Sequence, residues 1–243
     1  MTARVGLIIP SSNRMVEQEM VRALPAGVQA HIMRLRMTGP HHVALAELLP
    51  RIEEATRTLM DAKCDLVAFH CTSASTELGL AGEERALAAV VRGGAPRATT
   101  TATAIRRAFA ALGARRVVLV TPYDARTTED EAAFLRSAGY DVLASTGFAL
   151  GGSDQFCATP EKFWLERTLA LARPEADAYL VSCANIATFP IIAELERRLD
   201  RAVVTSNQAV LWDALCRLGR GDREQCPGRL FDHMPAVPAA RRA

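Results

Sequence analysis

Two stretches of the sequence decide the fold, Asp65-Leu66-Val67-Ala68-Phe69-His70-Cys71 and Asp177-Ala178-Tyr179-Leu180-Val181-Ser182-Cys183. Each is an apolar run that opens at an aspartate and closes at a cysteine, and the two lie 112 positions apart. The same offset relates Val5-Gly6-Leu7-Ile8-Ile9-Pro10 to Val117-Val118-Leu119-Val120-Thr121-Pro122. Two independent features that agree on one offset indicate an internal duplication.

Short runs rich in Val, Ile and Leu alternate with longer segments of helical period, which is typical of βαβ units in a parallel sheet. We therefore predict an α/β protein with two pseudo-symmetric, Rossmann-like domains, parallel sheets and an active site in the cleft between them. Residues 1–113 form the first predicted copy and 114–206 the second, while the C-terminal helix and tail, 207–243, are expected to pack back on the first copy. The predicted strands are 4–9, 29–33, 116–121, 141–145, 202–206 and the two that end at Cys71 and Cys183. The predicted helices are 45–62, 104–112, 128–138, 190–199 and 208–218, with two more that begin after Asn13 and at Thr159-Pro160-Glu161.

The second copy contains an extra stretch, residues 146–158, with the sequence Gly151-Gly152-Ser153-Asp154 near its middle. Its composition predicts a mobile loop near the cleft. The chain has neither the P-loop pattern nor G-x-G-x-x-G, so ATP and NAD have little support.

The bulk properties exclude several classes of function. The 243 residues carry 29 basic and 27 acidic side chains, and a net charge of +2 gives no reason to expect nucleic acid as a partner. No signal-peptide pattern and no apolar run of membrane-spanning length is present. The six cysteines form no C-x-x-C pair and no zinc pattern. We expect a cytoplasmic protein with no metal and no cofactor, and a homodimer is one option for its assembly.

Four predicted strands end in polar or reactive residues, and ligands of parallel α/β sheets collect beyond such strand ends. A thiol at a strand-to-helix turn lies near the positive end of the next helix, which is expected to lower its pKa. The free N–H groups and hydroxyls of such turns suit a carboxylate. The four ends are Pro10-Ser11-Ser12-Asn13, Cys71-Thr72-Ser73, Thr121-Pro122-Tyr123 and Cys183-Ala184-Asn185.

Each of these residues also has a purely structural interpretation. A single strand-terminal cysteine is most simply a buried core residue, and the matched pair is what favours chemistry. Thr72, Ser73 and Asn13 can cap helices, a role that is compatible with ligand binding. Tyr123 suits a surface loop as well as a ligand contact. Alternation along the strand points His70 away from Cys71, which favours a core histidine. His41 and His42 lack a third metal ligand.

The sequence resembles the aspartate/glutamate racemase superfamily, in the branch that contains maleate cis-trans isomerase and arylmalonate decarboxylase. Gly6-Leu7-Ile8-Ile9-Pro10-Ser11-Ser12-Asn13 and Arg34-Leu35-Arg36-Met37 look like isomerase motifs, whereas Thr72-Ser73, Trp212-Asp213-Ala214 and Gly228-Arg229-Leu230-Phe231-Asp232 look like decarboxylase motifs. The decarboxylases have glycine at the first thiol position, and the isomerases and racemases have both cysteines. The resemblance implies Cys71 and Cys183 as the catalytic pair, with substrate held by Ser12, Asn13, Thr72, Ser73, Tyr123 and the backbone of Ala184.

Four functions stay open at this point. The first is a cofactor-independent isomerase of a small carboxylic acid, in which Cys71 adds to a double bond and Cys183 protonates the adjacent carbon. The second is an amino-acid racemase, in which the two thiols act as acid and base on opposite faces. The third is an arylmalonate decarboxylase-like enzyme, which needs only Cys183. The fourth is a non-catalytic protein that binds small acids.

Overall fold

The computed structural model describes residues 2–37, 43–221 and 226–234. It contains two four-stranded parallel sheets with the same strand order, β2-β1-β3-β4 and β6-β5-β7-β8. The strands are β1 (Ala3–Pro10), β2 (Val28–Leu35), β3 (Leu66–Phe69), β4 (Ala98–Thr100), β5 (Arg116–Thr121), β6 (Asp141–Gly147), β7 (Ala178–Val181) and β8 (Ala202–Thr205). The predicted α/β class is confirmed, and β3 and β7 keep the offset seen in the sequence.

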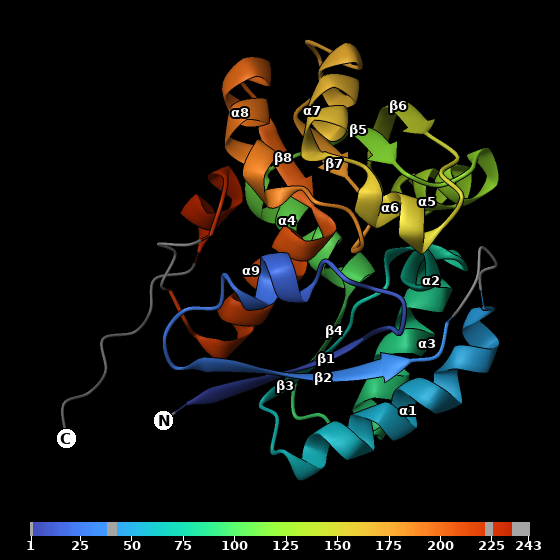
Figure 1. The fold of residues 1–243 in the computed structure, drawn as a ribbon, viewed down its shortest axis with the longest axis vertical. Coiled ribbons are helices and arrows are strands. Elements are labelled where there is room, and N and C mark those ends of the chain that lie inside the picture. The colour runs from blue at the N-terminus through green and yellow to red at the C-terminus, as the bar shows by residue number, and fades with distance from the viewer. Residues whose placement is uncertain (1, 38–42, 222–225, 235–243) are drawn as a thin grey trace.

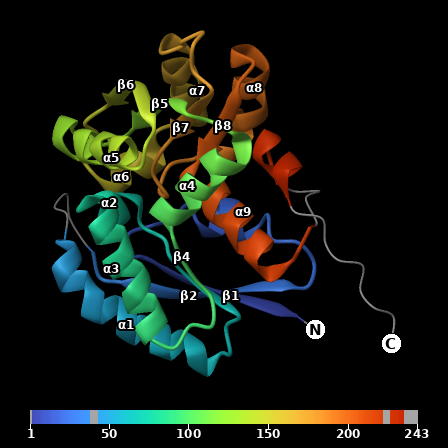
Figure 2. The ribbon, with the colours of Figure 1, turned by 180° about the vertical axis from the view of Figure 1, so that it is seen from behind.

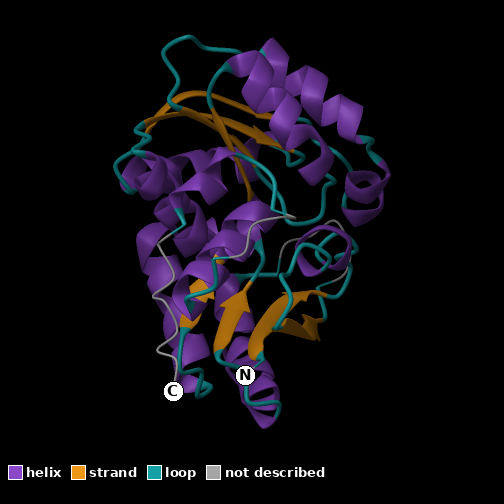
Figure 3. Ribbon diagram, turned by 90° about the vertical axis from the view of Figure 1, so that its left-hand side faces the viewer, coloured by secondary structure: helices purple, strands orange, loops and turns teal. Residues whose placement is uncertain are grey.

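The two sheets lie at opposite ends of the long axis, with helices between them and on both outer sides (Figures 1 and 3). The outer face of the first sheet is covered by α1 (Leu45–Asp61) and α3 (Gly79–Arg92), and that of the second by α7 (Glu161–Ala170) and α8 (Phe189–Leu199). Between the sheets lie α4 (Thr101–Leu112), α9 (Ser206–Leu218) and the π-helical turn η1 (Glu17–Val21) (Figure 2). The remaining elements are α2 (Thr72–Thr76), α5 (Ala125–Ser137), α6 (Ser153–Ala158) and η2 (Arg229–His233).

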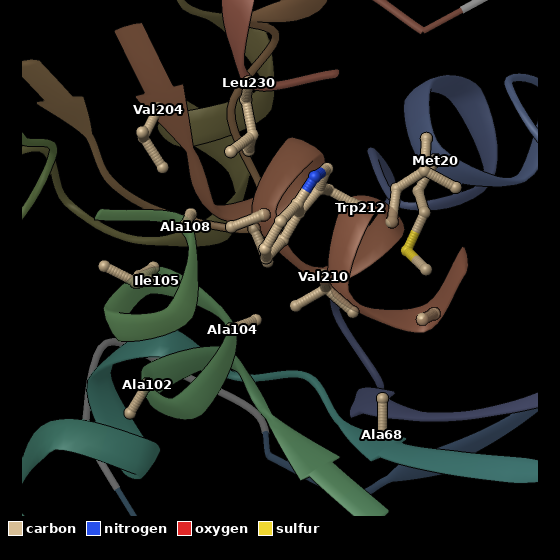
Figure 4. Packing of buried hydrophobic residues seen from close by; sticks show 14 of the residues in the cluster. Met20, Ala68, Ala102, Ala104, Ile105, Ala108, Val204, Val210, Trp212 and Leu230 are labelled. Carbon is tan, nitrogen blue, oxygen red and sulfur yellow. The ribbon is translucent and has the colours of Figure 1, made fainter. Parts of the chain in front are cut away.

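Alternation along the strands divides the core into three parts. Val5, Leu7 and Ile9 of β1 point into a central core that both sheets share, while Ile8 packs with α1 and α3. The central core gathers Ala68 of β3, Val204 of β8 and Trp212 of α9, among others (Figure 4). The second sheet sends its other face to α7 and α8. The two halves are therefore joined by buried apolar surface, which stabilises their relative placement.

The central strands β1, β3, β5 and β7 are largely buried on both faces, whereas the edge strands β2 and β6 are partly exposed. The sequence patterns missed β4, which is only three residues long, and the helices α2 and α3. The helix expected after Asn13 is wrong, because only the turn Glu17–Val21 is helical there. No helix in the described ranges is long and apolar enough to cross a membrane.

Two predictions about residues 146–160 are wrong. The loop expected at 146–158 instead contains the end of β6 and the six-residue helix α6. Thr159 does not cap α7; its hydroxyl donates to the Gln155 carbonyl, and Pro160 occupies the N-cap position. Local hydrogen bonding to α6 has thus displaced the expected cap.

The segment after β8 returns to the first half, where α9 packs on α4 and contacts β3 and β4. The domain boundaries given above stay a prediction, since α9 also contacts β8 and completes the shared core. His41, His42, residues 222–225 and the last nine residues lie outside the described residues.

Candidate active site

The eight residues predicted to form the site all line one cavity of about 350 Å³ between the two halves. The strand ends of both sheets open into it, so the pseudo-symmetry of the fold brings residues from distant parts of the chain together. The predicted residues that line it are Ser12, Asn13, Cys71, Thr72, Ser73, Tyr123, Cys183 and Ala184.

Cys71 lies at the carboxyl end of β3 and occupies the N-cap position of α2. Its backbone is extended, with φ −146°, and its side chain is 6% exposed. The N–H of Ala74 and the Ser73 hydroxyl, whose Oγ lies 3.9 Å from the sulfur, both face the thiol. These are the donors that a strand-to-helix turn supplies, as predicted for this end.

Cys183 follows β7 in a different local structure. No helix begins beside it, because α8 starts six residues later at Phe189. Its φ of 153° lies where side chains are rarely found, a conformation that costs on the order of 1–3 kcal/mol and is typical of functional sites. The N–H of Asn185 donates to its sulfur at 3.3 Å, and the phenol of Tyr123 also hydrogen-bonds to it.

The expectation that the thiol pKa values are lowered is wrong for this structure. Burial raises the pKa of the Cys71 thiol, and it raises the pKa of the Cys183 thiol to about 12. The nearby donors lower both values by less than burial raises them. The helix that was expected to lower the pKa has only five residues after Cys71 and is missing after Cys183. Both thiols are therefore held mainly in the neutral form.

Ser12, Asn13 and Ala184 connect the two halves at the cavity. The Asn13 amide Nδ2 donates to the Ala184 carbonyl at 2.8 Å, and its Oδ1 accepts from the N–H groups of Met15 and Val16, a capping role. Ser12 Oγ lies 2.8 Å from Ser153 Oγ of α6. These side chains hold the two walls of the cavity at a fixed separation, in addition to lining it.

His70 is a core histidine, as alternation predicted. Its Nδ1 lies 2.9 Å from Thr101 Oγ1 and its Nε2 lies 2.8 Å from Asn207 Oδ1. Burial lowers the pKa of His70 to about 4. The Asn207 amide donates in turn to the buried Glu19, whose carboxylate also accepts from the N–H of Phe189. The histidine is therefore neutral and links β3 to α9 rather than acting on Cys71.

Sequence reasoning missed a second buried acid near the cysteines, Glu131 on α5, together with Ser182 and Ser206. Two signals could have found them. Glu131 falls at helical spacing from Thr128 and Leu135, on the buried face of α5. Ser206 follows β8 and is a fifth polar strand end, which the prediction had placed inside the strand.

The mouth of the cavity is formed by α6 and the segment before it. Leu150 and Phe156 from this region and Met37 from the first half provide apolar lining, and the ring of Phe156 packs edge-on against Tyr123 with centroids 6.0 Å apart. Arg14 of the first half donates to the Asp154 carboxylate at 2.7 Å and so fastens α6 from outside. The described lining contains no Lys or Arg. The described ranges hold no group of three His, Cys, Asp or Glu side chains that could hold a metal ion.

Two thiols at matched strand ends of a parallel fold with two like sheets line one cavity, as the resemblance to the aspartate/glutamate racemase superfamily implies. The family model for arylmalonate decarboxylase matches residues 5–231, and the chain belongs to that family. It is 28% identical to the arylmalonate decarboxylase of Bordetella bronchiseptica over 95% of this chain and 97% of that protein. It is 27% identical to the maleate isomerase of Nocardia farcinica over 98% of each chain.

A solved structure of the Nocardia farcinica maleate cis-trans isomerase is also similar. It is a cysteine-to-serine variant with a covalently bound succinylcysteine intermediate. The TM-score is 0.88 at 25% identity, over 95% of this chain and 98% of that one. The predicted branch of the superfamily is thereby confirmed.

Proposed function

We propose that this protein is a cofactor-independent isomerase of a small dicarboxylic acid, of the maleate cis-trans isomerase type. One observation carries the proposal: Cys71 and Cys183 line the same cavity from opposite halves of the fold. The similarity to maleate isomerases supports it, because one of them has been solved with a succinylcysteine intermediate.

In the proposed reaction, Cys71 first gives its proton to solvent, and the resulting thiolate attacks one alkene carbon of maleate. A sulfur–carbon bond forms, and the π electrons move to the neighbouring carbon, which takes a proton from Cys183. The former double bond is then a single bond and can rotate. The Cys183 thiolate removes the proton again, the double bond re-forms in the trans geometry, and the sulfur–carbon bond breaks. Cys71 regains its thiolate, so the cycle needs no oxidant and no reductant.

Neutral donors are proposed to bind the carboxylates, because the described lining offers no Lys or Arg. Ser73, Tyr123 and the backbone of Ala184 lie at positions that suit this role, with Ser12, Asn13 and Thr72 beside them. The raised pKa of Cys183 suits a proton donor, since a thiol that holds its proton tightly is neutral before the reaction.

The test is proton NMR in deuterium oxide with maleate, aspartate, glutamate and phenylmalonate as separate substrates. We expect conversion of maleate to fumarate by the native chain and its loss in Cys71→Ala. Deuterium uptake at the α-carbon of aspartate or glutamate without maleate conversion would instead identify a racemase. Full turnover of maleate by Cys71→Ala would refute the two-thiol mechanism.

Decarboxylation of an arylmalonate is the second candidate. The apolar side chains of Met37, Leu150 and Phe156 favour it, since an apolar wall destabilises a departing carboxylate. Only Cys183 is needed as proton donor, so Cys71→Ala is expected to leave this activity in place. Release of carbon dioxide from phenylmalonate by that variant would establish it.

The small carboxylate partner is part of this proposal. The homodimer and the cytoplasmic location stay predictions, and sedimentation analysis of the purified chain tests the first of them.

A further inference from the structure

A buried carboxyl group behind the cavity is joined to both cysteine-bearing strand ends by a chain of hydroxyls. Glu131 is 1% exposed, and its Oε1 accepts from the Ser182 hydroxyl at 2.5 Å. Ser182 Oγ lies 3.4 Å from Ser206 Oγ. Ser206 Oγ in turn accepts from the Thr72 hydroxyl at 2.9 Å and from the N–H of Cys183 at 3.1 Å. Thr72 lines the cavity, so the chain runs from the cavity wall to Glu131.

The direction of each proton in this chain follows from counting donors. A hydroxyl has one proton to donate and two lone pairs to accept with. Ser182 gives its proton to Glu131, so the bond between the two serines must be donated by Ser206. Ser206 uses both lone pairs on Thr72 and Cys183. With Glu131 ionised, every hydroxyl proton therefore points towards Glu131, and the proton of Thr72 points away from the cavity.

The surroundings of Glu131 favour its neutral form. Burial raises the pKa of Glu131 to about 7, and the hydrogen bond from Ser182 offsets only part of that effect. Within the described part of the chain its Oε2 has no hydrogen-bond partner. The titratable groups that face Glu131 are Tyr123 and Cys183 at the strand ends. Those on the elements packed against α5 are Glu83 of α3, paired with Arg106, the exposed Glu84 and Arg85 of α3, Arg92 of α3, paired with Glu53, and Asp141 at the start of β6.

We propose that Glu131 takes up one proton when a carboxylate enters the cavity, and that the hydroxyls of Thr72, Ser206 and Ser182 reverse as it does so. The proposal rests on the carboxylate-binding function given above. The incoming anion favours protonation of Glu131, because a second negative charge nearby disfavours the ionised form.

Every proton that moves in this step is accounted for. One proton from solvent binds the Thr72 oxygen from the cavity side, and Thr72 passes its own proton to Ser206. Ser206 passes its proton to Ser182, and Ser182 passes its proton to Glu131. Each hydroxyl ends with one proton, Glu131 gains one, and all of them now point the other way. The proton of Thr72 then faces the cavity, where it donates to the bound carboxylate.

The consequence is that Glu131 acts as a positioning residue for the binding of substrate. It does not touch the substrate, but its protonation state decides whether Thr72 is a donor or an acceptor towards the cavity. A dicarboxylate is held without a buried cation because the protein supplies a proton together with the donor.

The test is calorimetry of the whole chain with succinate, which has no double bond to isomerise, in buffers that differ in ionisation enthalpy. We expect an uptake of about half a proton per bound succinate at pH 7, rising to about one at pH 8.5, because Glu131 is ionised in a larger fraction of molecules at the higher pH. The two thiols, with raised pKa values, stay protonated in this range and do not contribute.

Glu131→Gln is expected to bind succinate with no proton uptake. Glu196→Gln is the matched control, because Glu196 is a buried acid of raised pKa that accepts the N–H groups of Val203 and Arg229 rather than a relay hydroxyl. The proton uptake of this variant should match that of the native chain. Thr72→Val and Ser182→Ala break the chain at two further points. Both should lower the uptake, because protonated Glu131 then no longer provides a Thr72 donor to the bound carboxylate, and they keep the test available if Glu131→Gln does not fold.

Each outcome decides the proposal. Uptake in the native chain that disappears in Glu131→Gln and falls in Thr72→Val and Ser182→Ala supports it. Full uptake in Thr72→Val would overturn the relay. Binding without any uptake by a chain that still isomerises maleate would overturn this inference and leave the proposed function standing. No binding of succinate or maleate at any pH would overturn both.

Discussion

The two cysteine-bearing strand ends are equivalent in topology and differ in chemistry. Cys71 and Cys183 follow the third strand of identically ordered sheets. A helix begins directly after Cys71, whose backbone is extended. The thiol of Cys71 faces donors from the same turn. Cys183 has a φ of 153°, contacts a phenol and lies close enough to Glu131 for that acid to raise its pKa. Duplication has therefore preserved the scaffold while the surroundings of the two thiols have diverged.

This difference suggests a division of roles. The donors around Cys71 are those that stabilise a thiolate, namely the Ala74 N–H and the Ser73 hydroxyl. Cys183 also has two donors, the Tyr123 phenol and the Asn185 N–H, but both Glu131 and Cys71 disfavour a negative charge on its sulfur, whereas the acid that does so at Cys71 is Glu77. We infer that Cys71 is the better nucleophile and Cys183 the better proton donor.

The largest predicted effect separates the roles of the two thiols. Cys183→Ala should lower both maleate isomerisation and arylmalonate decarboxylation by about 10³-fold, because both need its proton. Cys71→Ala should abolish only the isomerisation. Steady-state rates on the two substrates give the comparison, with Cys216→Ala, a remote thiol beside Met234, as control. Equal losses of both activities in the two variants would mean that the thiols share one role.

The second prediction concerns the pH dependence of thiol alkylation. For Cys183, whose pKa is raised to about 12, the thiolate fraction grows about tenfold per pH unit, or about 100-fold from pH 7 to 9. The pKa of Cys71 is also raised, so its thiolate fraction also rises with pH over this range. For Cys183 the rise continues towards about pH 12. Peptide mass spectrometry after brief iodoacetamide treatment measures both sites, with free cysteine as the reference. A rate that is flat between pH 7 and 9 would show an activated thiolate instead.

The third prediction concerns the Tyr123 phenol, which hydrogen-bonds to Cys183. Tyr123→Phe removes a hydrogen bond to the developing Cys183 thiolate, which is worth about 1.5–3 kcal/mol for a charged acceptor, so turnover should fall about 10- to 100-fold. Tyr140→Phe is the matched control, because that hydroxyl donates to the Arg106 carbonyl, away from the cavity. Loss of activity without loss of thermal stability would support this role of Tyr123, whereas an unchanged kcat would contradict it.

The strands other than β4, and the thiol pair, were predictable because their signals are local or repeated. A buried parallel strand is a short apolar run, and the offset that relates Cys71 to Cys183 appears twice in the sequence. The thiol pKa values were predicted with the wrong sign, because burial is a property of the folded cavity and outweighs the local donors.

The relay from Thr72 to Glu131 was beyond sequence reasoning for a related reason. Its members come from α2, the residue after β7, α9 and α5, and no periodic pattern states which of these elements meet. The helix α6 was missed because Gly151 and Gly152 favour a loop, whereas contacts with the first half hold residues 153–158 in place.

The smallest predicted effect tests α6, for which the sequence shows no counterpart in the first half. Ser153→Ala removes the 2.8 Å hydrogen bond to Ser12, worth about 0.5–1.5 kcal/mol, and should raise KM about 2- to 10-fold with kcat almost unchanged. Ser137→Ala, at an exposed helix end, is the matched control. A fall in kcat instead would mean that α6 acts on the chemical step, because Phe156 on the same helix packs against Tyr123 beside the Cys183 thiol.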